Sequence, residues 1–68
     1  MSHSDRLERM ESEASVLKSN TDKLCSFIAS ESFHELSHLH KTLLKGQFNA
    51  MTNYLAILKC RIELLTKE

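Results

Sequence analysis

The stretch from Leu43 to Leu65 constrains the fold most, because it is the most apolar run in the chain and its apolar residues repeat at heptad spacing. The first ridge follows the 4-3-4-3-4-3 spacing of a helix packed along one seam; it consists of Leu44, Phe48, Met51, Leu55, Leu58, Ile62 and Leu65. An adjacent second ridge consists of Leu43, Gln47, Ala50, Tyr54, Ile57, Arg61 and Leu64. One partner helix can cover only one ridge, so we expect the second ridge to meet another subunit.

The N-terminal part of the chain supplies a partner helix, predicted over residues 5–30. Its seam has 3-4-3-4-3-4 spacing and consists of Leu7, Met10, Ala14, Leu17, Thr21, Leu24 and Ile28. Asp5, with Glu8 three residues later, has the pattern of a helix N-cap, and Ser4 is the alternative cap. Charged and hydroxyl side chains flank this seam, as in an amphipathic helix.

Residues 31–37 break the helical periodicity and predict a bend. Ser32 and Glu35 have the spacing of a capping box for a short turn. Ser37 is a plausible N-cap for a second helix over residues 38–66. We expect Phe33 and Leu36 to plug this end of the molecule. The two long helices match in length, and a short connection makes such helices antiparallel neighbours.

These features predict an all-α fold in one domain, residues 1–68. The chain has no proline and a single glycine, Gly46, so the residues that break helices and make tight turns are almost absent. The expected architecture is a helical hairpin with a short bend. At 68 residues a hydrophobic core is marginal without further support, and we expect association into a homo-oligomeric helical bundle.

Composition excludes several classes of function. The formal net charge is zero, which argues against general nucleic-acid binding. No apolar run approaches the roughly 18 residues of a membrane span. Cys25 and Cys60 could form one bridge at most; without a signal peptide, reduced thiols that act as small hydrophobic filler in the cytoplasm are the better interpretation.

The sequence contains one motif typical of an enzyme, HExxH, running from His34 to His38. In zinc peptidases both histidines lie on one helix face, whereas here the motif straddles the predicted bend. A solvated bend is the simplest interpretation, and a fortuitous transition-metal site that uses His34, His38 and His40 is the alternative. We therefore expect no enzyme activity, no catalytic residue and no cofactor.

The stretch from Gly46 to Asn53 is unusual, because weak helix formers cluster in the middle of a predicted helix. One interpretation is that packing tolerates them and that Gly46 allows close helix approach. The other is that neutral amides and Tyr54 line a polar interface or a ligand site. Between Leu36 and Ile62 the chain has cations but no carboxylate, which indicates either a solvated face or a surface for an anion.

Two segments resemble a known family: KLCSFIASESFHEL (residues 23–36) and LLKGQFNAMTNYLAILKCRI (residues 43–62). Over roughly residues 5 to 65 the chain resembles very short phage proteins related to a crAss-like phage protein. Members of that family have a KL-x-x-FI-x-S segment and a helix with Q-x-x-x-M-x-x-Y-x-x-x-L-x-x-RI. Typical members have a proline-rich or acidic bend, whereas this chain has His34, His38 and His40 there.

The resemblance implies a phage origin and an oligomeric helical fold. Small phage hairpins of this kind include counter-defence proteins that sequester the cyclic nucleotide signals of bacterial immunity in the host cytoplasm. For such a ligand the candidate binding residues are Lys23, Phe33, Lys45, Gln47, Asn49, Asn53, Tyr54 and Arg61. Lysine and arginine would neutralise phosphates, the aromatic rings would stack on bases, and the amides would contact base edges. The alternatives are a module that binds and inhibits a host protein and a small helical co-chaperone.

Overall fold

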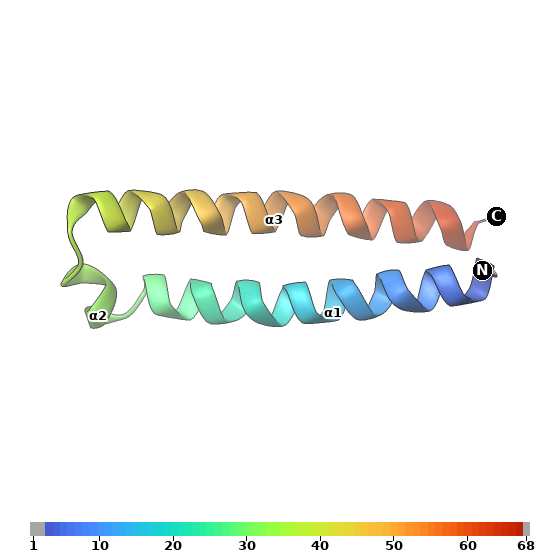
Figure 1. Ribbon diagram of the computed structural model, residues 1–68, viewed down its shortest axis with the longest axis horizontal. Coiled ribbons are helices and arrows are strands. Elements are labelled where there is room, and N and C mark those ends of the chain that lie inside the picture. Colours follow the sequence, from blue (N-terminus) through green and yellow to red (C-terminus); the bar gives the residue numbers. More distant parts are fainter. Residues whose placement is uncertain (1–2, 68) are drawn as a thin grey trace.

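The chain forms a helical hairpin in the computed structural model, which describes residues 3–67. Helix α1 spans His3–Ile28, the short helix α2 spans Glu31–His34, and helix α3 spans His38–Thr66. Helices α1 and α3 run antiparallel side by side, with α2 at one end and both termini at the other (Figure 1). The described residues contain helices and no strand, which confirms the all-α prediction; association into a bundle stays a prediction.

Two serine hydroxyls cap the helices that follow the bend. The Ser37 side chain accepts a hydrogen bond from the His40 backbone N–H at 3.3 Å, which confirms the predicted N-cap of α3. Ser30 caps α2 by accepting from the Phe33 backbone N–H at 3.4 Å. The prediction that Ser32 caps this turn is therefore wrong, because α2 already begins at Glu31.

The other helix bounds differ slightly from the predicted ones. Ser4 and Asp5 both lie inside the first turn of α1, so the prediction that either one caps this helix is wrong. Helix α1 ends at Ile28 rather than at residue 30, because Ser30 has the extended backbone of a cap, with φ −86° and ψ 162°.

The core forms along the two predicted seams. Every member of both seams is buried or half-buried, and Leu58 has no exposed surface. Met10, Leu58 and Leu65 form the most buried cluster, near the end that carries both termini. At the other end Phe33 is 2% exposed and packs edge-to-face on Phe27 with ring centroids 6.2 Å apart. The predicted plug by Phe33 is confirmed.

Thr21 is the one polar member of the α1 seam, and it is buried. Its hydroxyl donates to the Leu17 backbone carbonyl at 2.7 Å. A buried hydroxyl that pairs with its own helix needs no partner on the opposite helix. The seam can therefore pass through Thr21 without an unsatisfied polar group.

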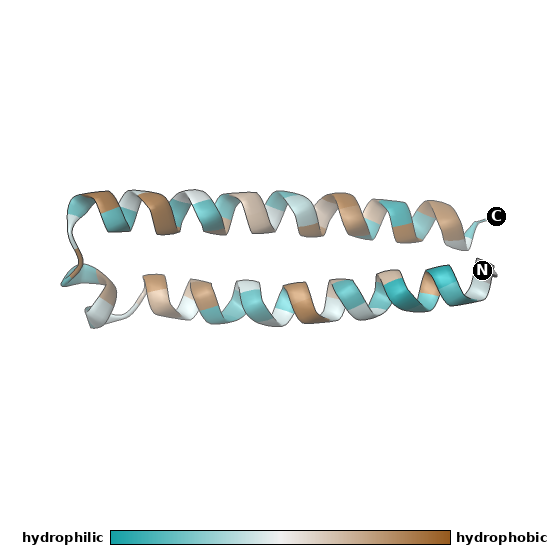
Figure 2. Cartoon of the chain, in the orientation of Figure 1, coloured by the Kyte–Doolittle hydropathy of each residue, from teal (hydrophilic) through white to brown (hydrophobic). Residues whose placement is uncertain are grey.

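The hairpin is thin, with extents of 48 × 17 × 14 Å. Figure 2 shows hydrophobic segments along the whole of α3, while α1 is mostly hydrophilic toward its N-terminus. Leu39, Leu43, Ile57 and Leu64 of α3 are all more than half exposed. Cys25 and Cys60 are exposed free thiols, so the prediction that they fill the core is wrong.

The core account predicts that Leu58→Ala lowers the free energy of unfolding by about 2–5 kcal/mol, because it opens a cavity where the side chain has no solvent contact. Val16→Ala removes exposed methyl groups and should change it by less than about 0.5 kcal/mol. Urea denaturation at one fixed protein concentration measures both. Equal losses in the two variants would contradict the assignment of Leu58 to the core.

The capping account predicts that Ser37→Ala destabilises the protein by about 1 kcal/mol, because the His40 backbone N–H loses its partner. Ser32→Ala is the matched control, since Ser32 lies inside α2 and caps no helix. Thermal unfolding of both variants by circular dichroism provides the comparison. A larger loss in the Ser32 variant would show that the helix start is misplaced.

Candidate functional site

One side of the hairpin joins α1 and α3 through polar side chains. The Tyr54 hydroxyl of α3 donates a hydrogen bond to the Glu13 carboxylate of α1. This hydrogen bond links the two long helices side chain to side chain. We call the surface around this pair the tyrosine flank; it comprises Arg6, Arg9, Ser12, Glu13, Val16 and Asn20 of α1 with Tyr54 and Arg61 of α3.

The hydrogen bond to Glu13 raises the pKa of Tyr54 above its ordinary value of 10.0. Partial desolvation and the negative charge of Glu13 act in the same direction, while the nearby Arg61 guanidinium opposes them. Tyr54 is therefore a neutral hydrogen-bond donor at physiological pH. The residue is 41% exposed, so part of its surface is open to a ligand.

An open groove of about 470 Å³ runs beside Tyr54. Its lining combines an aromatic ring, a guanidinium, a carboxylate and small polar groups; the lining residues are Arg9, Ser12, Glu13, Val16, Leu17, Asn20 and Tyr54. Its volume lies in the range typical of small-molecule sites, but such sites usually bury most of the ligand surface. A single hairpin offers only one wall of such a site.

A second hollow of about 200 Å³ places two arginines together near the termini. It is lined by Arg6, Met10, Arg61, Leu64 and Leu65. Arg61 follows Tyr54 by two helical turns and so lies on the same face of α3. Within the described part of the chain, Arg6, Arg9 and Arg61 form no ion pair. Three guanidinium groups therefore remain available to an anion on this flank.

The predicted residues Phe33 and Lys45 lie together at the bend, away from this flank. The Lys45 ammonium is 5.8 Å from the centroid of the Phe33 ring, a cation–π contact. Phe33 is buried against Phe27 and has almost no exposed face on which a base could stack. We therefore assign this pair to the structure of the bend.

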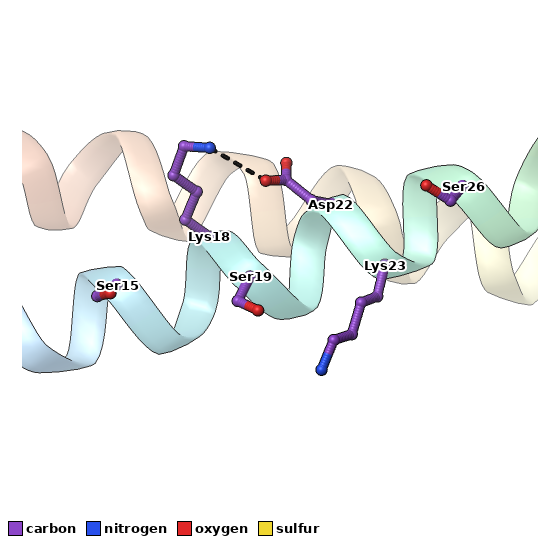
Figure 3. A pocket seen from close by; sticks show the side chains of 6 residues that line it. All are labelled: Ser15, Lys18, Ser19, Asp22, Lys23 and Ser26. Atoms are coloured by element: carbon purple, nitrogen blue, oxygen red, sulfur yellow. Dashed lines mark hydrogen bonds and ion pairs between the residues drawn. The ribbon is translucent and has the colours of Figure 1, made fainter.

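Lys23 lies on another surface of α1, in a shallow hollow of about 380 Å³ that also contains serines. Figure 3 shows that all six lining side chains come from α1 and that Lys23 points away from Lys18 and Asp22. Lys18 and Asp22 form an ion pair at 3.0 Å. One helix surface with an internal ion pair gives a ligand little enclosure.

The predicted amides lie on the exposed surface of α3. The Gln47 amide nitrogen is 3.9 Å from the Met51 sulfur, and Asn49 and Asn53 are exposed. Of the predicted candidates, the structure brings Tyr54 and Arg61 together on one flank. It leaves Lys23, Phe33 and Lys45 elsewhere.

The sequence interpretation missed Arg6, Arg9, Glu13 and Asn20. The antiparallel register could have found two of them, because equal helices joined by a short bend fix which residues lie level. The pairs Glu13–Tyr54 and Arg6–Arg61 each have residue numbers that total 67. Applying that register to the α1 sequence would have placed Arg6 and Glu13 beside the second ridge.

The HExxH residues do not share one helix face. His34 ends α2, while His38 and His40 lie in the first turn of α3. Within residues 3–67 no group of three histidine, cysteine, aspartate or glutamate side chains could hold a metal ion. No helix in that range is long and apolar enough to cross a membrane.

Comparison with known proteins identifies a family. The family model described as Sequestin matches residues 4–64, which is most of the chain. No curated protein and no solved structure matches it.

The geometry of the flank predicts the titration of Tyr54, which is the only tyrosine in a chain without tryptophan. Its raised pKa means that the hydrogen bond to Glu13 stabilises the fold below the ordinary tyrosine pKa. That contribution is lost as the pH rises through the raised value. Absorbance at the phenolate band should therefore give a midpoint above that of free tyrosine.

Glu13→Gln should return this midpoint toward the ordinary value, because the charged acceptor is gone. Glu11→Gln is the matched control, since it removes a carboxylate from α1 without touching Tyr54. Identical midpoints in the wild type and the Glu13 variant would contradict the contact.

Proposed function

We propose that this chain, which belongs to the Sequestin family, is an oligomeric binding protein. It would sequester an anionic, nucleotide-type ligand on the tyrosine flank. The family name indicates a small protein that sequesters a ligand or another protein. Following the resemblance to short phage proteins, we further propose a phage-encoded counter-defence role. The ligand would be a nucleotide signal of bacterial immunity, held in the host cytoplasm.

The observation that carries the proposal is a single flank with one partly exposed tyrosine and three guanidinium groups that form no ion pair among residues 3–67. Arginine binds phosphate oxygens through two parallel N–H donors, which gives both affinity and orientation. An aromatic ring stacks on any base with a gain of about 1–3 kcal/mol. A nucleotide presents both a phosphate and a base, so the flank offers a suitable contact for each.

The charges on the flank also suggest the orientation of the ligand. Arg6 and Arg61 share a hollow near the termini, whereas Glu13 lies beside Tyr54. A phosphate would be repelled by the Glu13 carboxylate and attracted by the two arginines. We therefore place phosphates near Arg6 and Arg61, and a base near Tyr54 with Asn20 and Ser12 at its edge.

Sequestration requires that most of the ligand be removed from solvent, and the groove is open. A second subunit against the flank would supply the missing wall. This requirement agrees with the expectation that a thin 68-residue hairpin associates. The proposal involves binding alone, so it assigns no catalytic residue and no cofactor.

A binding screen tests the proposal. Thermal-shift and calorimetric titrations would use cyclic dinucleotides, cyclic trinucleotides and ADP-ribose derivatives. At least one should raise the melting temperature in proportion to its concentration, as a ligand of the native state does. Arg61→Ala should weaken that binding by about tenfold or more, which corresponds to about 1.4 kcal/mol.

Lys59→Ala is the matched control, because it removes a cation from α3 that does not line the flank. Tyr54→Phe keeps the ring and should retain stacking, while Tyr54→Ala should lose it. No stabilisation by any member of the panel, with the protein folded, would end the nucleotide proposal. A single stoichiometric host protein captured without nucleotide would instead favour the protein-inhibitor alternative.

A further inference from the structure

A second heptad seam runs along the face of α3 that points away from α1. Its spacing is 4-3-4-3-4-3-4, and we call it the outer seam; it consists of Leu39, Leu43, Gly46, Ala50, Asn53, Ile57, Cys60 and Leu64. All eight residues are exposed in the hairpin. Its four large apolar side chains are 57–65% exposed, which is unusual for aligned leucine and isoleucine in a soluble helix.

The outer seam is distinct from the tyrosine flank. Tyr54 bonds to Glu13 of α1, so that position belongs to the side of α3 nearest α1. Asn53 and Gly46 of the outer seam each stand one position before a residue on that side, Tyr54 and Gln47 respectively. They therefore lie farther around the helix from α1. At 100° per residue the outer seam is centred about 140° from the core seam, and α1 cannot cover it.

The outer seam has a size pattern that is complementary to itself when one copy is reversed. Leucine stands at both ends of the seam, two small residues stand at its centre, and between them large and small residues occupy matching distances from the two ends. An antiparallel copy centred between Ala50 and Asn53 pairs positions whose numbers total 103. The layers are Leu39 with Leu64, Leu43 with Cys60, Gly46 with Ile57, and Ala50 with Asn53.

Gly46 provides the most specific argument for this register. Within the hairpin, a Cβ atom at Gly46 would meet nothing within 4 Å, so internal packing does not require glycine there. Glycine is also the poorest helix former after proline. Opposite Ile57 of a second copy, however, the missing side chain makes room for a large one. A parallel pairing would set glycine against glycine and leave a void.

The residues that flank the outer seam fit a pairing of identical chains. On one side of the outer seam Gln47 lies near Tyr54 of the second copy, and on the other side Asn49 lies near Ala56 of the second copy, each pair being two positions from level. These central flanks are neutral, so two identical helices meet without the like-charge repulsion that charged flanks would create. This accounts for the run of uncharged, weak helix formers in the middle of α3.

We propose that the outer seam binds a second copy of this chain, with the two α3 helices antiparallel in the register given above. The inference rests on the oligomeric part of the proposed function and deepens it. Tyr54 lies between the core seam and the outer seam, so the partner helix brings Gln47 of the second copy toward the tyrosine flank. The site would thus be completed by the neighbouring subunit.

Disulfide trapping without any nucleotide tests this register, because Cys60 faces position 43 across the proposed interface. Leu43→Cys in a Cys25→Ser background should form a disulfide-linked dimer under mild oxidation. Thr52→Cys in the same background is the matched control, because Thr52 is exposed on α3 outside the outer seam, and it should stay largely unlinked. Non-reducing gels and mass spectrometry of the linked peptides provide the measurement.

Adding Cys60→Ser to the Leu43→Cys variant should abolish the link. A disulfide that persists joins two positions 43 and would overturn the antiparallel register in favour of a parallel one. Equal linking at positions 43 and 52, or a monomer by light scattering, would overturn the proposed interface. Because no nucleotide is present, these outcomes are separate from those of the ligand screen.

A size swap gives an independent check. Gly46→Ile should weaken dimerisation by at least tenfold in sedimentation equilibrium, and Ile57→Ala should weaken it through lost apolar contact. The double variant should recover part of the affinity, since the large and small residues exchange places across each layer. Loss in both single variants without recovery in the double variant would contradict the pairing of these two positions.

Discussion

Two helices can bury only one seam each, and the rest of this structure depends on that constraint. The seam pairing of α1 with α3 uses almost every core residue, yet few side chains become fully buried. No third element covers the back of α3 within residues 3–67. The hairpin therefore keeps a row of exposed leucine and isoleucine side chains whose burial would stabilise it further. A single hairpin therefore leaves part of the apolar surface of α3 exposed.

The tyrosine flank follows from the same geometry. The side chains next to the core seams meet across the two helices at each edge of the hairpin. At one edge this meeting places Tyr54 against Glu13 and Arg61 beside Arg6. The site is shallow because a pair of helices has no concave surface deep enough to enclose a ligand. A second copy would change that, and binding and association would then be linked thermodynamically.

Sequence periodicity predicted the fold well because heptad spacing states directly which residues meet. It identified both seams, Thr21 as the polar member, and Ser37 as a cap. It was less successful at the bend, where Ser30 and Ser32 have similar capping potential and tertiary packing of Phe33 decides between them. It also placed Phe33 among ligand-binding residues, although packing against Phe27 leaves that ring buried.

For the site, the sequence pointed to Tyr54 and Arg61 but not to their neighbours on α1. Those neighbours are adjacent in space through the register of the hairpin, and no local motif contains both helices. The second ridge expected from the sequence also differs from the outer seam. It contains Gln47, Tyr54 and Arg61 where the outer seam contains Gly46, Asn53 and Cys60. The contact between Tyr54 and Glu13 shows that the side of α3 carrying Tyr54 turns toward α1.

Native mass spectrometry of the purified protein tests the central claim most directly, since it reports subunit count and retained small ligands together. The account predicts an even-numbered assembly that carries a nucleotide-type mass when isolated from cells that produce the signal. A monomer without ligand under the same conditions would contradict it.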